Sequence, residues 1–154
     1  MPAPINNNAA GVIPRLVDMG IDPYLIAPTL ILAIAQRLAQ AMCPTSKKPR
    51  PVDGGIRALI EKQFEDLSPE LRKKVTIPKE VYDAEPSAEC PGGTRGRLGV
   101  FELLSIDKEM EKIILENPVE ASILKAARAQ GMFTMKEDAM FKAFDGKIPF
   151  NEVN

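Results

Sequence analysis

Positions 96–107 carry a short run of valine, phenylalanine, leucine and isoleucine, with glycines at its start and an aspartate at its end. β-Branched and aromatic residues between turn-forming residues are typical of a β-strand. The residues after this run follow a helical pattern, and those before it are mixed and interrupted by prolines. A single strand is unstable until a second strand pairs with its backbone groups, so we expect a partner strand far upstream.

The N-terminal part of the chain predicts a first amphipathic helix. Asn8 can cap it, and Gly20 is suited to end it. Its apolar face comprises Ala9, Val12, Ile13, Leu16 and Val17. Pro14 falls inside this segment, where its ring and missing N–H should kink the helix or move its start downstream.

A second helix is predicted directly afterwards. Asp22 followed by Pro23 is the pattern of a helix cap and first turn, and positions 24–35 are almost entirely apolar. We therefore expect a buried helix over 24–35. Positions 36–42 either continue this helix or form a short strand, because their apolar residues fit both periods.

Proline and glycine become frequent between positions 43 and 95. Seven prolines and two glycine pairs interrupt this region, which leaves one plausible helix at 56–67 and a short helical turn at 71–74. Such a composition supports only a thin core, so we interpret the region as an inserted or linking module.

Three short amphipathic helices are predicted after the strand, over positions 107–116, 118–130 and 134–146. An aspartate can cap the first, and a threonine followed three residues later by a glutamate can cap the third. Glycines can end the second and the third. Together they predict a small helical lobe, in an α/β chain that is mainly helical.

Composition narrows the possible functions. The 154 residues carry a formal net charge of −1, so the chain lacks the cationic field of a protein that neutralises many phosphates, and we expect no nucleic-acid partner. Histidine is absent, which excludes Ser-His and Cys-His nucleophile pairs, imidazole acid-base catalysis and His-ligated metal. Two cysteines are too few for a secreted disulfide scaffold, the apolar run at 25–35 is too short to span a membrane, and we see no signal segment, so we expect a cytoplasmic protein.

Four segments, in order along the chain, resemble the C-terminal part of the type II secretion and type IV pilus assembly ATPases. They are AAGVIPRLVDMG at 9–20, AIAQRL at 33–38, GRLGVFELL at 96–104 and GMFTMKED at 131–138. The resemblance implies the tail of a RecA-like nucleotide-binding core, an inserted cysteine-bearing module and a C-terminal three-helix lobe. These parts would span 1–42, 43–95 and 96–154, with the strand at 96–106 returning to the core sheet beside 37–42.

The residues that would bind ATP in this family are not found in the chain. A phosphate-binding loop is a glycine-rich turn closed by Lys and Ser or Thr, whereas Gly146-Lys147 is followed by isoleucine and lacks the earlier glycine. The family's His-Thr-Asn motif would fall at Ile5, Asn6 and Asn7, so only its asparagine is kept. We therefore expect no catalytic residue, no cofactor-binding residue, and no ATP or magnesium bound by this chain alone, although the resemblance implies both for the full-length protein.

Members of this family often carry two Cys-x-x-Cys pairs that hold a zinc ion through four thiolates. In this chain the first pair keeps only Cys43 and the second keeps only Cys90. Two thiolates without a histidine do not complete a tetrahedral site. We expect no metal site and two reduced, inert cysteines.

Arg95 and Arg97 lie among glycines at the start of the predicted strand. Guanidinium groups match phosphate geometry, and glycines let a ligand or another backbone approach closely, so both are candidates for a phosphate or subunit-interface contact. The alternative is a solvated strand entry with an ion pair to the core. Glu102 alternates with apolar neighbours and would lie on the wet face or be paired; without a second carboxylate it is a poor general base.

Two functions remain open. The first is the C-terminal part of a homo-hexameric ATPase for type IV pilus assembly or type II secretion, which would contact the upstream ATPase half, neighbouring subunits and an inner-membrane platform protein. The second is a standalone, non-catalytic interaction module that binds such a motor or platform protein. Either would lie in the cytoplasm, peripheral to the inner membrane through its partners. For the first we expect an exposed apolar patch where the absent half would pack, comprising Val12, Ile13, Leu25, Ile31, Leu32 and Ile34.

Overall fold

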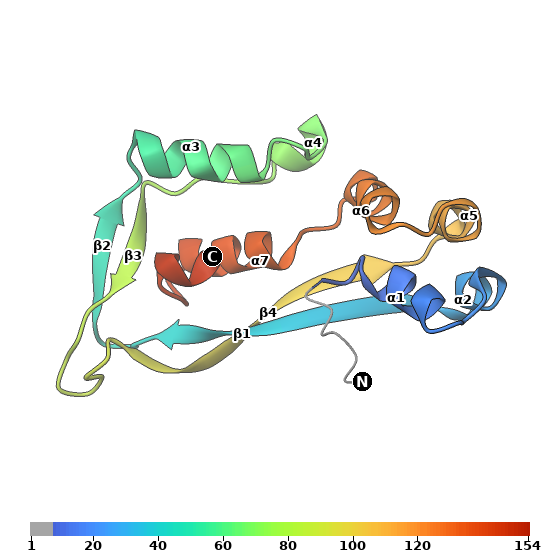
Figure 1. Cartoon of the computed structure of the whole chain (residues 1–154). Helices are drawn as coiled ribbons and strands as arrows, with labels where there is room; N and C mark the ends of the chain where they lie inside the picture. The colour runs from blue at the N-terminus through green and yellow to red at the C-terminus, as the bar shows by residue number, and fades with distance from the viewer. Residues whose placement is uncertain (1–7) are drawn as a thin grey trace. The chain divides into compact units, whose positions relative to one another are not determined.

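The computed structural model describes residues 8–154 (Figure 1). Its elements are α1 (Val12–Asp18), α2 (Pro23–Thr29), β1 (Leu32–Met42), β2 (Lys47–Pro51), α3 (Gly54–Gln63), α4 (Pro69–Arg72), β3 (Glu80–Ala84), β4 (Thr94–Ser105), α5 (Lys108–Glu116), α6 (Glu120–Ala129), α7 (Met135–Phe144) and the 3-10 helix η1 (Phe150–Val153). In the described residues β1 pairs with β4 and β2 pairs with β3, and both pairs are antiparallel.

The chain divides into two compact units. The first contains the residues through 36 together with 101–134, and the second contains 37–100 together with 135–154. The long strands β1 and β4 therefore contribute residues to both units. In the described part of the chain, no helix is long and apolar enough to cross a membrane.

The pairing of β1 with β4 confirms that the strand predicted at 96–106 has its partner at 37–42. The helix expected over 24–35 is wrong, because β1 begins within that range. α2 ends at Thr29, Leu30 is extended, and the strand begins at Leu32. The strand period was present in the sequence, because small alanines alternate with larger residues through Leu32–Met42 and the alanines face inward. Pairing with β4 satisfies backbone groups that a strand leaves open, and this long-range pairing decides between the two periods.

The start of α1 lies downstream of Ala9, as expected if Pro14 moves the start of the helix rather than kinking it. The helix begins at Val12, so the proline lies in the first turn, where an N–H has no intrahelical partner to lose. The Oδ1 atom of Asn8 accepts a hydrogen bond from the N–H of Gly11 at 2.8 Å, just ahead of the helix. Gly20 ends the segment with φ of 88°, a conformation that glycine adopts without a Cβ penalty.

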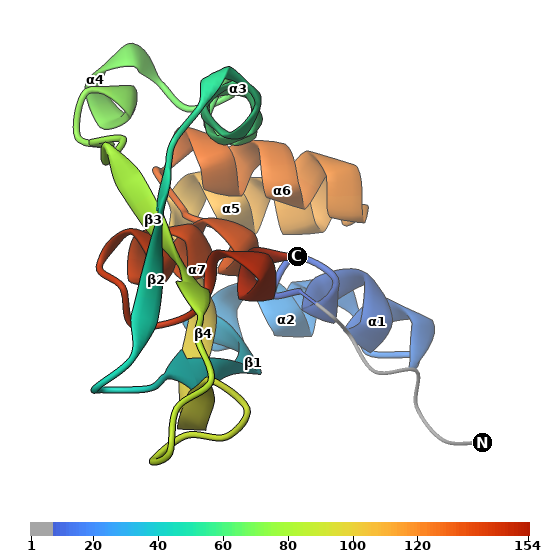
Figure 2. The ribbon, with the colours of Figure 1, turned by 90° about the vertical axis from the view of Figure 1, so that its left-hand side faces the viewer.

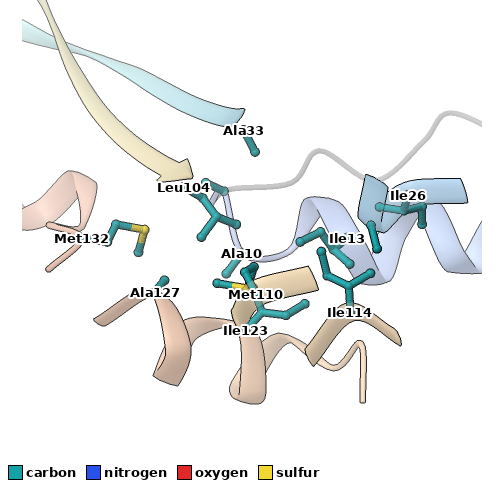
Figure 3. Close-up of a cluster of buried hydrophobic side chains, with 12 residues drawn as sticks. Ala10, Ile13, Ile26, Ala33, Leu104, Met110, Ile114, Ile123, Ala127 and Met132 are labelled. Atoms are coloured by element: carbon teal, nitrogen blue, oxygen red, sulfur yellow. The ribbon is translucent and has the colours of Figure 1, made fainter. Parts of the chain in front are cut away.

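The core of the first unit lies between four helices and one face of the long strands. α1 and α2 contribute Ile13 and Ile26, and α5 and α6 contribute Ile114 and Ile123 (Figure 3). Ala33 of β1 and Leu104 of β4 belong to the same cluster, to which Ala9, Ala10, Ala27, Met110, Ala127 and Met132 also contribute. Each fully buried isoleucine or leucine contributes on the order of 1.5–3 kcal/mol to folding, so this cluster is the main stabilising feature of the unit.

The second unit is organised around the β2–β3 pair. Lys47 lies opposite Ala84 and Pro51 opposite Glu80. α3 and α4 are inserted between the two strands, with Asp53 capping α3 through its hydrogen bond from Ile56 N–H. The expected helices of this region are thus present, but both begin two residues earlier than predicted, and α3 ends at Gln63 rather than at 67. α7 and η1 pack against β3. They add to the small core that residues 43–95 could form alone.

The helices predicted after the strand all form, but they do not make one lobe. α5 and α6 bury their apolar residues in the first unit, whereas α7 belongs to the second. α7 packs on β3 and η1, and the ring of its Phe141 lies 5.5 Å from that of Phe64 in the segment after α3. Helical spacing identifies which residues of a helix are buried, but not which neighbour covers them.

Candidate functional site

One face of the long strands is apolar and exposed within the first unit. Leu32 and Ile34 of β1 keep 42% and 58% of their surface exposed, and Phe101 and Leu103 of β4 keep 39% and 51%. We call these four residues the strand face. Their alternate neighbours Ala33 and Leu104 point into the core, so the strand face looks away from it.

Leu32 and Ile34 of the strand face belong to the apolar patch that the sequence predicted. Leu25, Ile31, Leu32 and Ile34 are exposed as expected, with Ile31 at 79%. Val12 is partly buried against the core. Ile13 is completely buried, so the prediction that it belongs to the exposed patch was wrong. α1 turns Ile13 inward because α2, α5 and α6 supply partners for it within this chain.

Glu102 lies on the buried side of β4, with only 3% of its surface exposed. Its carboxylate accepts a hydrogen bond from the N–H of Ala9 at 2.8 Å, so of the two alternatives for this residue the paired one is correct. A buried carboxylate needs such donors, and this bond attaches the segment before α1 to the strand. Glu102 is therefore a structural residue beneath the strand face.

We expect Glu102→Ala to loosen the N-terminal segment. Removing the carboxylate leaves the Ala9 N–H without this acceptor, at a cost of about 1–3 kcal/mol. Amide hydrogen exchange of residues 9–18 should accelerate by roughly 5- to 150-fold, while Glu102→Gln, which keeps an acceptor oxygen, should have a smaller effect. Glu85→Ala, at an exposed position, is the control. Equal exchange rates in all three variants would contradict this role.

Arg95 and Arg97 occupy the first part of β4, within the second unit. Both side chains are exposed, and neither makes an ion pair or hydrogen bond with the described residues. Gly96 between them has φ of 80°, and the space where its Cβ would lie is empty. The core ion pair considered above is absent within the described part of the chain, and the two guanidinium groups are available to an external anion. Their role in a phosphate or subunit contact stays a prediction.

Cys43 and Cys90 form a disulfide, which corrects the expectation of two reduced cysteines. Their Cα atoms are 6.2 Å apart, and both residues are buried. The approach depends on the loop before β4, where Gly93 N–H donates to Cys90 O and Cys43 N–H donates to Gly93 O. The bond describes the oxidised chain, and a reducing environment would leave two thiols instead. Within residues 8–154 no group of three or more potential metal ligands is present.

The disulfide sharpens the expectation about metal. Purified in air, the chain should contain well under one zinc per molecule and no free thiol, because oxidised sulfurs are not zinc ligands. A chelator should leave the melting temperature unchanged. A reductant should lower the free energy of unfolding by about 2–4 kcal/mol, and Cys90→Ser should remove that response. Stoichiometric zinc, with a melting temperature lowered by chelator, would contradict the expected absence of zinc and the expected lack of response to a chelator.

The position of the His-Thr-Asn motif, Ile5 to Asn7, lies outside the described residues. The sequence identified Arg95, Arg97, Leu32 and Ile34 as candidates. It did not identify Phe101 and Leu103, which complete the strand face with Leu32 and Ile34. The missed signal was the alternation on both strands, which buries one face and leaves large apolar side chains on part of the other. The arrangement offers a binding surface and, within the described part of the chain, the unpaired guanidinium groups of Arg95 and Arg97.

The chain is similar to proteins of known systems. The family model described as "Type II/IV secretion system protein" matches residues 6–154. Type II secretion system protein E of Pseudomonas aeruginosa is 32% identical over 96% of this chain and 27% of its own length. The type IV pilus assembly ATPase PilB of Acinetobacter baylyi is 32% identical over 96% and 24%, and the type II secretion system ATPase E of Vibrio cholerae is 32% identical over 96% and 27%. The chain thus spans about a quarter of the length of these relatives.

Proposed function

The chain belongs to the family of type II/IV secretion system proteins, and we propose that it is the C-terminal part of a hexameric ATPase that powers type IV pilus assembly or type II protein secretion. The observation that carries the proposal is the strand face. Four large apolar side chains on two paired strands form a surface that a soluble monomer rarely leaves uncovered. In this proposal the upstream part of the ATPase covers it, and β1 and β4 join the edge of a RecA-like sheet.

The comparisons support the proposal in two ways. Each relative that names an activity is an ATPase of one of these two systems. The match extends along nearly the whole of this chain but along only about a quarter of each of those relatives, so in them most of the protein lies outside the matched segment. An apolar surface that stays exposed among the described residues is what such a division predicts.

The turn at Gly146 does not have the features of a phosphate-binding loop. Gly146 and Lys147, the closest approach to a phosphate-binding loop, form the turn after α7, and their N–H groups donate to Ala143 O and Lys142 O. The Nζ atom of Lys147 lies 3.7 Å from an Asp145 oxygen. Backbone N–H groups used in a helix end cannot cradle a phosphate. In this proposal the upstream part supplies the nucleotide site, while Arg95 and Arg97 contact phosphate or a neighbouring subunit.

Location and further partners follow from the same proposal. The assembled ATPase would lie in the cytoplasm and reach the inner membrane by contacting a platform protein of the pilus or secretion apparatus. The alternative, a non-catalytic module that binds a motor or platform protein, would also need an exposed surface. The two differ in what covers the strand face.

The test is to mix this chain with the upstream part of the 32% identical type II secretion protein E and measure association by analytical ultracentrifugation. The chain alone should self-associate through the strand face, and the mixture should give a defined complex. A highly stable monomer that ignores the upstream part, yet binds an intact motor, would contradict the ATPase-part proposal and favour the interaction module.

A further inference from the structure

A groove lies between α5 and α6, entirely within the first unit and away from the residues of the strand face. Figure 2 shows these two helices side by side. The groove has a volume of about 760 Å³, and its apolar lining comes from Ile113 of α5 and from Ala126 and Ala129 of α6. Small alanines on α6 leave the space open, because their side chains end at Cβ.

The charges around the groove are predominantly negative. Asp107, Glu109 and Glu116 supply three carboxylates, and Lys125 supplies the only ammonium among the lining residues. Glu109 pairs with Lys112 at 3.0 Å, but this pair is exposed and therefore weak. Glu116 makes no hydrogen bond or ion pair with the described residues. The negative charge of Glu116 still acts on Lys112. The pKa of Lys112 is raised mainly by its hydrogen bond to Glu109, then by the charge of Glu109, and least by the charge of Glu116.

The spacing of the two glutamates matches a helical ligand. Glu109 and Glu116 are seven residues apart on α5, which is about two turns or roughly 10 Å, and they lie on the same side of that helix. A helix lying along the groove repeats its own side chains at the same interval. Apolar residues of such a helix can contact Ile113, Ala126 and Ala129, while flanking lysines or arginines approach the carboxylates.

We propose that the groove between α5 and α6 binds a basic amphipathic helix of a partner protein. Nucleic acid is disfavoured because its phosphates would face three carboxylates. A small polar ligand is disfavoured because the groove is open and its lining has few buried polar groups to orient one. The proposal does not rest on the proposed function, since the groove and the strand face are separate sets of residues.

The test uses the full chain and two synthetic helical peptides of about 18 residues, long enough to span the groove. One carries leucines at helical spacing with lysines elsewhere, and the other has glutamates in place of the lysines. Fluorescence anisotropy measures affinity, and a photo-reactive group on each peptide locates the contact by mass spectrometry even if the chain self-associates. The basic peptide should bind and cross-link to 107–130, and added salt should weaken it.

The variants decide between the groove and general stickiness. Glu109→Lys with Glu116→Lys should weaken the basic peptide by at least about tenfold and improve the acidic one. Asp18→Lys with Glu85→Lys changes the net charge equally at exposed positions elsewhere and should have little effect. Ala129→Trp, at an exposed lining position, should block binding without changing charge. Cross-links on the strand face, equal binding of both peptides, or equal effects of the two double variants would overturn the proposal.

Discussion

The chain by itself should show no magnesium-dependent ATP turnover above a matched buffer blank. Phosphoryl transfer depends on a backbone cradle, a lysine, magnesium and an oriented water, which together position and stabilise the transferring group. None of these was found in the sequence, and the turn at Gly146 has its N–H groups engaged in the helix end. Losing one electrostatic donor typically lowers the rate on the order of a hundred- to a thousand-fold, so losing the set leaves nothing measurable.

Turnover should appear when this chain replaces the matching segment of a relative that carries a phosphate-binding loop upstream. Type II secretion protein E of Pseudomonas aeruginosa is a suitable recipient at 32% identity. In that chimaera Arg97→Ala should reduce turnover, because its guanidinium group makes no ion pair or hydrogen bond with residues 8–154 and can contact another component. Lys74→Ala, at an exposed position after α4, is the control. ATP hydrolysis by the isolated chain that survives further purification would overturn the assignment.

Charge placed on the strand face should abolish assembly with the upstream part. Ile34→Glu with Leu103→Glu would bury two unpaired carboxylates in the interface, and each costs several kcal/mol unless it finds a partner. We expect association to weaken by more than about a hundredfold, equivalent to about 2.7 kcal/mol. The same variant should reduce self-association of the isolated chain, because it removes the exposed apolar surface.

The matched control places the same charges on other exposed leucines. Leu59→Glu with Leu115→Glu changes apolar residues that are 43% and 40% exposed and lie outside the strand face. This variant should associate normally. If both pairs weaken association equally, general surface charge explains the effect. If neither pair does, the upstream part does not cover the strand face, and the proposed function loses its main support.

Local sequence determined most helix positions. Asp22 and Asp107 each accept a hydrogen bond from a backbone N–H in the first turn that follows, as the sequence predicted. Asp53 does the same before α3, where no cap was predicted. Gly20, Gly131 and Gly146 end segments with positive φ. These features depend on atoms a few residues apart, so the sequence alone is enough to place them. The strand at 96–106 and its partner at 37–42 were identified by composition and by the family resemblance, respectively.

Tertiary structure decided which elements share a core. Helical spacing grouped α7 with α5 and α6, but long-range contacts place α7 on β3 and η1 instead. Cys43 and Cys90 are 47 residues apart, and only the folded loop brings them to bonding distance. Ile13 of α1 is buried because α2, α5 and α6 supply apolar partners for it, whereas Leu32 and Ile34, equally apolar, stay exposed because nothing in the described chain covers their side of the strands. An apolar side chain favours burial wherever it lies in the sequence. Which partner buries it depends on contacts between distant segments, and a local sequence pattern does not specify those contacts.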